Sequence, residues 1–105
     1  MTTSQSKASK TEEKILTKHP LGKKGKNISK QKYEAIRKAI LTSLRTGEHT
    51  HDELFDRLKN DLRGKFDGNI SWYGETVKLD LEANRLIERT SSKPARYRLI
   101  AKKNG

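Results

Sequence analysis

The chain has 105 residues, of which only 30% are hydrophobic, so it can form one small domain with tails but not a large buried core. Its formal net charge of +11 makes nucleic acid the first partner to consider, ahead of an anionic membrane surface or an acidic protein. Cysteine and long apolar runs are both absent, which argues against disulfides, cysteine zinc sites and membrane spans and leads us to expect a cytoplasmic protein.

Residues 1–27 are expected to form a basic, largely disordered arm, because Ser, Thr and Lys dominate and little can be buried. One helical turn is possible over Thr11–Leu16. Gly22 and Gly25 lie too close together for the phosphate-binding loop of nucleotide hydrolases. We therefore expect only a non-specific contribution to anion binding from the lysines of this basic segment: Lys23, Lys24 and Lys26.

Two helices are predicted after the arm. Ser29 is a good N-cap for a helix over residues 30–45, in which apolar residues recur every three or four positions. Gly47 then stands where a helix C-cap glycine is common. Thr50 and Glu53 have the spacing of a capping box, which predicts a second helix over residues 51–62.

A third helix is predicted from Ser71 to near Arg85, after a linker that is longer than the usual turn between such helices. Tyr73, Val77 and Leu81 are spaced by four and share one face. The opposite face is expected to be exposed and polar, and to include Lys78 and Arg85 among its charged residues.

Residues 86–90 and 96–100 read as two antiparallel strands joined by a turn. Tyr97 and Leu99 alternate with basic residues, which is typical of a half-buried ribbon. Cations on the outer side of this hairpin would repel one another unless an anion lay across them, and a phosphate backbone would supply that anion. The cations in question are Lys93, Arg96, Arg98 and Arg89. A solubilising surface ribbon is the alternative.

Three helices followed by a basic hairpin resemble a winged helix-turn-helix domain. The expected fold class is therefore α+β: a three-helix winged helix-turn-helix over residues 28–100 with a two-stranded C-terminal β-hairpin wing, followed by a basic tail over residues 101–105. The resemblance implies that the third helix lies in a major groove. Base reading there favours Arg, Lys, Asn or Gln, whereas Glu75 and Glu82 would oppose DNA, so a mainly structural helix remains an equal alternative.

A second apolar strip, formed by Trp72, Leu79 and Leu86, lies beside the main face of the third helix. Core packing is the commoner outcome for such a strip, and a dimer or partner surface is the alternative. Asp80 interrupts it, so we expect Asp80 either to pair with an Arg or Lys side chain or to lie where this face meets another chain. Gly74 implies a close neighbour, either the first helix or a phosphate.

No catalytic or metal site stands out. His49, His51 and Asp52 are close in sequence but too few for a closed metal site. No Ser, His and acid arrangement or paired carboxylates suggest an enzyme, and a core this small leaves little room for a pocket. We expect a non-enzymatic protein without a cofactor.

A narrower resemblance covers residues 19–99, and its most specific part runs from Trp72 to Ala83. The chain is similar to a family of small, uncharacterised bacterial proteins with no assigned activity, so the likeness supports a fold and a bacterial cytosolic setting but not a function. The residues that carry it are His19-Pro20, Gly22-Lys23, Tyr33, Ser71 to Tyr73, Val77 to Ala83, Lys93-Pro94 and Tyr97 to Leu99.

The sequence thus predicts binding of double-stranded DNA, mainly through backbone phosphate and with low sequence preference. The expected contacts are Lys93, Arg96, Arg98 and Arg89 at the wing, Lys78, Arg85, Ser71 and Asn69 at the third helix, and Lys23, Lys24 and Lys26 in the arm. The alternative is a protein-interaction module that forms a homodimer or binds another protein through the Trp72 strip. RNA binding is a third possibility.

Overall fold

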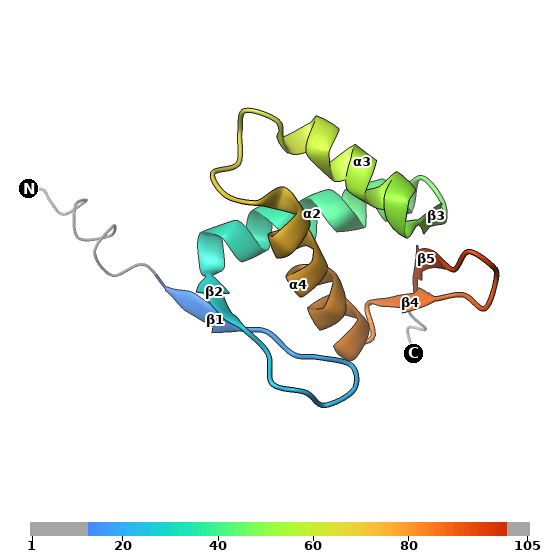
Figure 1. Ribbon diagram of the computed structural model, residues 1–105, viewed down its shortest axis with the longest axis horizontal. Helices are drawn as coiled ribbons and strands as arrows, with labels where there is room; N and C mark the ends of the chain where they lie inside the picture. The colour runs from blue at the N-terminus through green and yellow to red at the C-terminus, as the bar shows by residue number, and fades with distance from the viewer. Residues whose placement is uncertain (1–12, 101–105) are drawn as a thin grey trace, which may run out of the picture.

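Three helices and two small antiparallel sheets make up residues 13–100, the part of the chain that the computed structural model describes. The elements follow one another as β1 (Lys14–Leu16), β2 (Asn27–Ser29), α2 (Lys30–Arg45), β3 (His49–Thr50), α3 (His51–Leu62), α4 (Ile70–Ala83), β4 (Ile87–Arg89) and β5 (Arg96–Leu99) (Figure 1). The fold class is α+β, as predicted. The predicted tail over residues 101–105 and the first part of the predicted arm lie outside the described residues.

Local capping explains why the helix starts could be predicted. Ser29 Oγ accepts a hydrogen bond from the Lys32 N–H at 3.3 Å. Thr50 and Glu53 form both bonds of the capping box, at 3.2 and 3.0 Å. Asn69 Oδ1 accepts from the Trp72 N–H at 2.9 Å and so caps α4. Each bond satisfies an N–H group that the helix itself leaves without a partner.

The core lies where the three helices meet. Ile36, Ile40, Leu54, Leu58, Val77 and Leu81 are fully buried there. Gly74 explains how α4 can pack so closely on α3, because a Cβ at this position would lie 2.6 Å from Phe55 Cε2 and 3.2 Å from Leu58 Cδ1. The close neighbours of Gly74 are therefore two side chains of α3. Neither the first helix nor a phosphate, the two predicted neighbours, is needed to explain the glycine.

The C-terminal sheet has three strands in the order β3-β5-β4, instead of the two that were predicted. The predicted hairpin is present, with Ile87 opposite Leu99 and Glu88 opposite Arg98. The additional strand is β3, which pairs His49 with Tyr97 and Thr50 with Arg96. Two residues are too few to show the period-two alternation by which a strand is recognised in a sequence.

Strands β1 and β2 form a β-hairpin over residues 14–29, so the prediction of a largely disordered arm is wrong for the part of it that this hairpin contains (Figure 1). Residues 14–16, placed in a possible helical turn, form strand β1. Ile15 pairs with the buried Ile28, and the Thr17 N–H donates to the Lys26 carbonyl at 2.8 Å. The composition resembles that of a disordered segment because the hairpin buries only a few side chains, among them Ile28 and Thr17.

Asp80 joins the hairpin to two helices. Its Oδ1 accepts a hydrogen bond from the backbone N–H of Lys18 at 2.8 Å, and its Oδ2 accepts from the Tyr33 hydroxyl of α2 at 2.6 Å. Asp80 is only 3% exposed, so both bonds matter for a carboxylate that would otherwise be buried without partners. Of the two alternatives predicted for Asp80, pairing with an Arg or Lys side chain is wrong, because its partners are a backbone N–H and a phenol.

This arrangement predicts a pH dependence of stability. Burial raises the pKa of Tyr33 to about 12 from its ordinary value of 10.0, and the bond to Asp80 acts in the same direction. A pKa that is higher in the folded state stabilises the fold below pH 10, and this contribution disappears as the pH approaches 12. Denaturant unfolding should therefore show a loss of stability over this range that is smaller in Tyr33→Phe. An equal loss in both proteins would contradict the assignment.

Candidate nucleic-acid interface

The wing arginines face carboxylates of their own chain. Arg98 Nε lies 2.7 Å from Glu88 Oε2, and its Nη1 lies 3.3 Å from Glu48 Oε2. Arg96 Nη1 lies 3.8 Å from Glu53 Oε1, and Arg89 Nη2 lies 3.6 Å from Glu82 Oε1. These glutamates supply the anions that the sequence argument assigned to phosphate. The arginines stay about half exposed, so solvent screens each ion pair and its contribution to stability is small.

Lys93 differs from the other wing cations. It lies in the exposed turn between β4 and β5, and no carboxylate within residues 13–100 forms an ion pair with it. A phosphate at this position would meet a positive charge that is not already neutralised. Of the four predicted wing contacts, Lys93 is the one whose surroundings fit the role best.

Lys78 is buried, so its predicted place on an exposed, DNA-facing side of the third helix is wrong. The residue is 1% exposed, and its Nζ lies 3.3 Å from Glu82 Oε2, 3.3 Å from the Tyr97 hydroxyl and 3.6 Å from Glu75 Oε1. The ammonium also lies 4.3 Å from the centroid of the Tyr97 ring. Lys78 therefore joins α4 to the C-terminal sheet and is not available to DNA.

Apart from Lys78, α4 and the residues that flank it offer few donors to a groove. Ser71 and Arg85 are exposed as predicted, whereas the Asn69 side chain already accepts the capping bond from Trp72. The remaining accessible surface carries Trp72, Leu79 and two glutamates, Glu75 and Glu82. This surface is apolar and acidic, so it does not match the donor-rich face that base reading favours.

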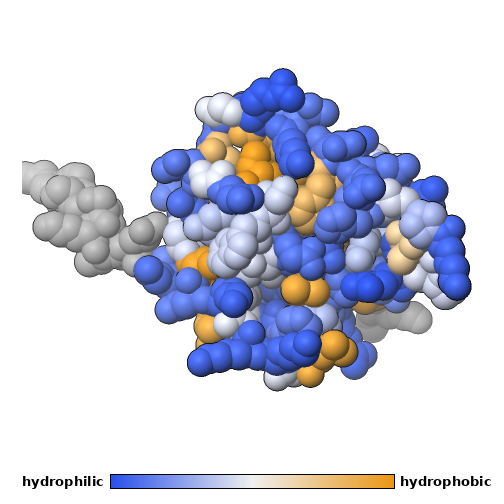
Figure 2. Space-filling model, viewed as in Figure 1, coloured by the Kyte–Doolittle hydropathy of each residue, from blue (hydrophilic) through white to orange (hydrophobic). Residues whose placement is uncertain are grey.

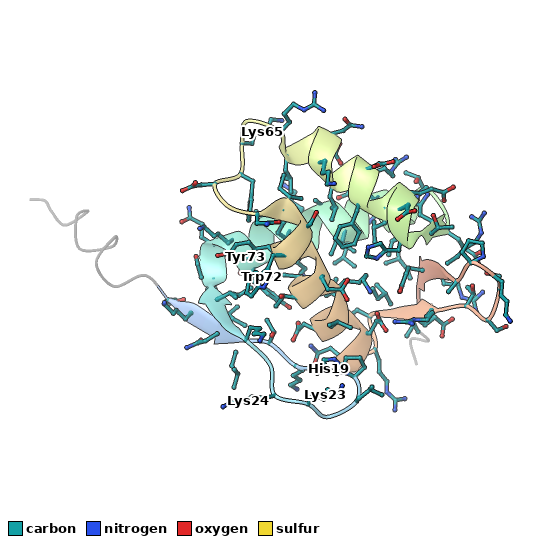
Figure 3. All side chains as sticks on the ribbon, viewed as in Figure 1. His19, Lys23, Lys24, Lys65, Trp72 and Tyr73 are labelled. Carbon is teal, nitrogen blue, oxygen red and sulfur yellow. The ribbon has the colours of Figure 1, made fainter. Side chains whose placement is uncertain are left out.

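The loop between β1 and β2 carries four cations without carboxylate partners among the described residues. Lys18, Lys23, Lys24 and Lys26 are exposed, and no ion pair joins them to an acidic residue in the part of the chain that the structure describes. Figure 3 shows Lys23 and Lys24 on this loop, beyond the C-terminal end of α4. Sequence reasoning named three of the four. It missed Lys18, although Lys18 belongs to the same basic segment.

The backbone of this loop is held in place at both ends. The Lys26 N–H donates to Thr17 Oγ1 at 2.9 Å, and the Lys18 N–H is bound to Asp80. A Cβ on Gly25 would lie 1.6 Å from the Thr17 carbonyl oxygen, so only glycine fits between the two arms of the hairpin. The lysine side chains thus extend from a fixed backbone next to α4.

The predicted second apolar strip does not pack into the core along its whole length. Trp72 remains 44% exposed, which makes it one of the large apolar side chains on the surface.

Within residues 13–100, no three His, Asp or Glu side chains gather into a possible metal site. No helix in this same range is long and apolar enough to cross a membrane.

Comparison with protein-family models matches residues 14–97 to a family of unknown function, DUF6958. The matched span begins at β1 and extends into β5, so the N-terminal hairpin is part of the family's domain. Searches of curated proteins and of solved structures find no match.

Proposed function

The chain belongs to this family of unknown function, and from its geometry we propose that it is a winged-helix protein that binds double-stranded DNA through backbone phosphates, with low sequence specificity. The order of elements supports the winged-helix assignment: three helices, a short strand between the first two, and a C-terminal β-hairpin that pairs with that strand. The net charge of +11 supports a polyanionic ligand.

The β1–β2 loop carries this proposal. Its four lysines, Lys18, Lys23, Lys24 and Lys26, are exposed and have no carboxylate partner among the described residues, whereas each wing arginine has one. Lysines that contact phosphates release counterions from DNA, and this release favours binding to any sequence. The loop therefore takes the role that the sequence argument gave chiefly to the wing, and Lys93 adds a contact at the wing tip.

Low specificity follows from the surface of α4. Glu75 and Glu82 are partly exposed and form ion pairs with Lys78, and as carboxylates they cannot donate hydrogen bonds to base edges. Trp72 and Leu79 offer no paired donors either. Contacts to phosphate fix position on the duplex without reading its sequence. We expect similar affinities for duplexes of unrelated sequence.

Salt dependence tests the proposal. If the four loop lysines and Lys93 neutralise about five phosphates, affinity should fall roughly 500-fold between 50 and 200 mM salt. Fluorescence anisotropy of a labelled random duplex, titrated at the two salt concentrations, measures this ratio. A dissociation constant that stays constant across the range would contradict phosphate binding.

A protein-interaction module is the second candidate, and the exposure of Trp72 favours it. Exposed aromatic residues are enriched where proteins meet. Size measurement in solution separates the two functions: a stable dimer at low micromolar concentration, together with no binding of random duplex, would support this candidate.

A further inference from the structure

An aromatic cluster lies at the N-terminal end of α4. The rings of Trp72 and Tyr73 meet edge to face with centroids 4.9 Å apart, and Tyr73 meets Phe66 in the same manner at 5.4 Å. Phe66 and Tyr73 pack against the core, whereas Trp72 is 44% exposed. The linker fits tightly around these rings, since a Cβ on Gly68 would lie 3.0 Å from Tyr73 and 3.2 Å from Phe66. The cluster therefore packs one exposed indole against two partly buried rings.

Two cations lie beside the cluster. Lys32 Nζ is 5.3 Å from the centroid of the Tyr73 ring, and Lys32 and Lys65 line a shallow hollow next to Phe66. Asp67 also borders this hollow. In the view of Figure 3, Trp72 and Tyr73 lie between Lys65 on one side and Lys23 and Lys24 on the other. Figure 2 shows the same face largely covered by hydrophilic side chains, with a pale patch over the junction of α2 and α4.

We infer that Trp72 stacks on an unpaired nucleobase of DNA, so that the protein prefers a duplex that continues into a single strand. An exposed aromatic face flanked by lysines is the combination by which single strands are bound without sequence preference. Bases within a duplex are stacked on one another and cannot reach the indole. A strand that leaves a duplex held by the β1–β2 loop would bring free bases to Trp72 and phosphates to Lys32 and Lys65.

This inference rests on the proposed function and refines its substrate class. A purely apolar protein partner explains the exposed indole less well, because it would cover Lys32 and Lys65 without giving either an anion. A DNA strand supplies both groups at once, an aromatic base for the indole and phosphate for the lysines.

Trp72 is the single tryptophan of the chain, so its fluorescence reports directly on the site. The probes are a blunt duplex, the same duplex with a short oligothymidine overhang, and that duplex with an abasic overhang of equal length. Only the thymine overhang should quench Trp72. Trp72→Ala should bind the thymine-overhang duplex roughly 5- to 150-fold more weakly and leave the blunt duplex unaffected.

Two further variants keep the test independent of folding. Trp72→Phe retains a stacking ring and should keep most of the preference for the overhang. Leu16→Ala removes an exposed apolar side chain of strand β1, outside the lysine-bearing loop, and should leave the preference unchanged. Circular dichroism establishes that each variant is folded, and anisotropy of labelled DNA measures affinity where the tryptophan is absent.

The outcomes separate the inference from the proposed function. Equal quenching by the abasic overhang, or an equal loss of both duplexes in Trp72→Ala, would overturn the stacking site. Quenching that rises with protein concentration in the absence of DNA, together with a dimeric mass, would show a protein contact instead. If the overhang quenches Trp72 while the blunt duplex does not bind, the proposed duplex-binding function fails and the stacking site stands.

Discussion

Replacing the four loop lysines by Gln is expected to remove most of the affinity for random duplex DNA. The quadruple variant is Lys18→Gln, Lys23→Gln, Lys24→Gln and Lys26→Gln. It should retain about one phosphate contact, so the effect of raising salt from 50 to 200 mM should shrink from roughly 500-fold to about fourfold. The bonds that hold the loop at Lys18 and Lys26 use backbone N–H groups, so the loop should keep its shape. Anisotropy titrations at both salt concentrations measure the change.

The matched control removes the same charge from another part of the surface. Lys38, Arg45, Arg57 and Lys59 are exposed on α2 and α3, and they form no ion pair with another described residue. In Figure 1, α3 and the β1–β2 loop lie on opposite sides of α4. Changing these four residues to Gln should lower affinity only slightly. A loss equal to that of the loop variant would show that overall charge, and not the loop, governs binding.

The three helices could be predicted because their signals are local. Ser29, Thr50 and Glu53 act on N–H groups within three residues, and each helix repeats its apolar positions along one face. The bounds of α2 and α3 agree with the prediction, whereas α4 begins one residue earlier than expected and ends at Ala83. That end is set by Arg85, which has a φ of 62° and therefore leaves the helical conformation.

The N-terminal hairpin could not be predicted because the contact that joins it to α4 is distant in sequence. Asp80 binds the Lys18 N–H across 62 positions, and no local pattern announces that pairing. The polar composition favoured disorder because composition does not show which residues become buried, and Ile28 is buried in the core. The burial of Ile28 and the bond from the Lys18 N–H to Asp80 attach the segment to the rest of the fold.

The charge of the wing shows a similar limit. Alternation placed Arg96 and Arg98 on one face, but the glutamates that neutralise them come from β4 and from residues before and within α3. A sequence reveals how many cations a hairpin carries, whereas their availability to a ligand depends on tertiary neighbours. The ion pairs of the wing therefore favour the β1–β2 loop as the candidate site.

Lys78→Ala is expected to lower the free energy of unfolding by roughly 3 kcal/mol, because removing one member of a buried ion pair leaves its partner uncompensated. Here Glu82 would keep only the longer contact to Arg89, and the Tyr97 hydroxyl would lose its bond to the ammonium. The sequence prediction placed Lys78 on an exposed face because it assumed that the helix buries only one face. In the structure, α4 buries residues on more than one face, and Lys78 is among them. Chemical denaturation measures the change.

Two comparisons make this prediction specific. Lys59→Ala removes an exposed lysine from α3 and should change the free energy of unfolding by no more than about 0.5 kcal/mol. Lys78→Met keeps most of the buried aliphatic stem and should fall between the two, which separates the contribution of packing from that of charge. Were Lys78→Ala instead to unfold like the parent protein and bind DNA more weakly, Lys78 would be a DNA contact and its buried contacts with Glu82 and Tyr97 would not exist in solution.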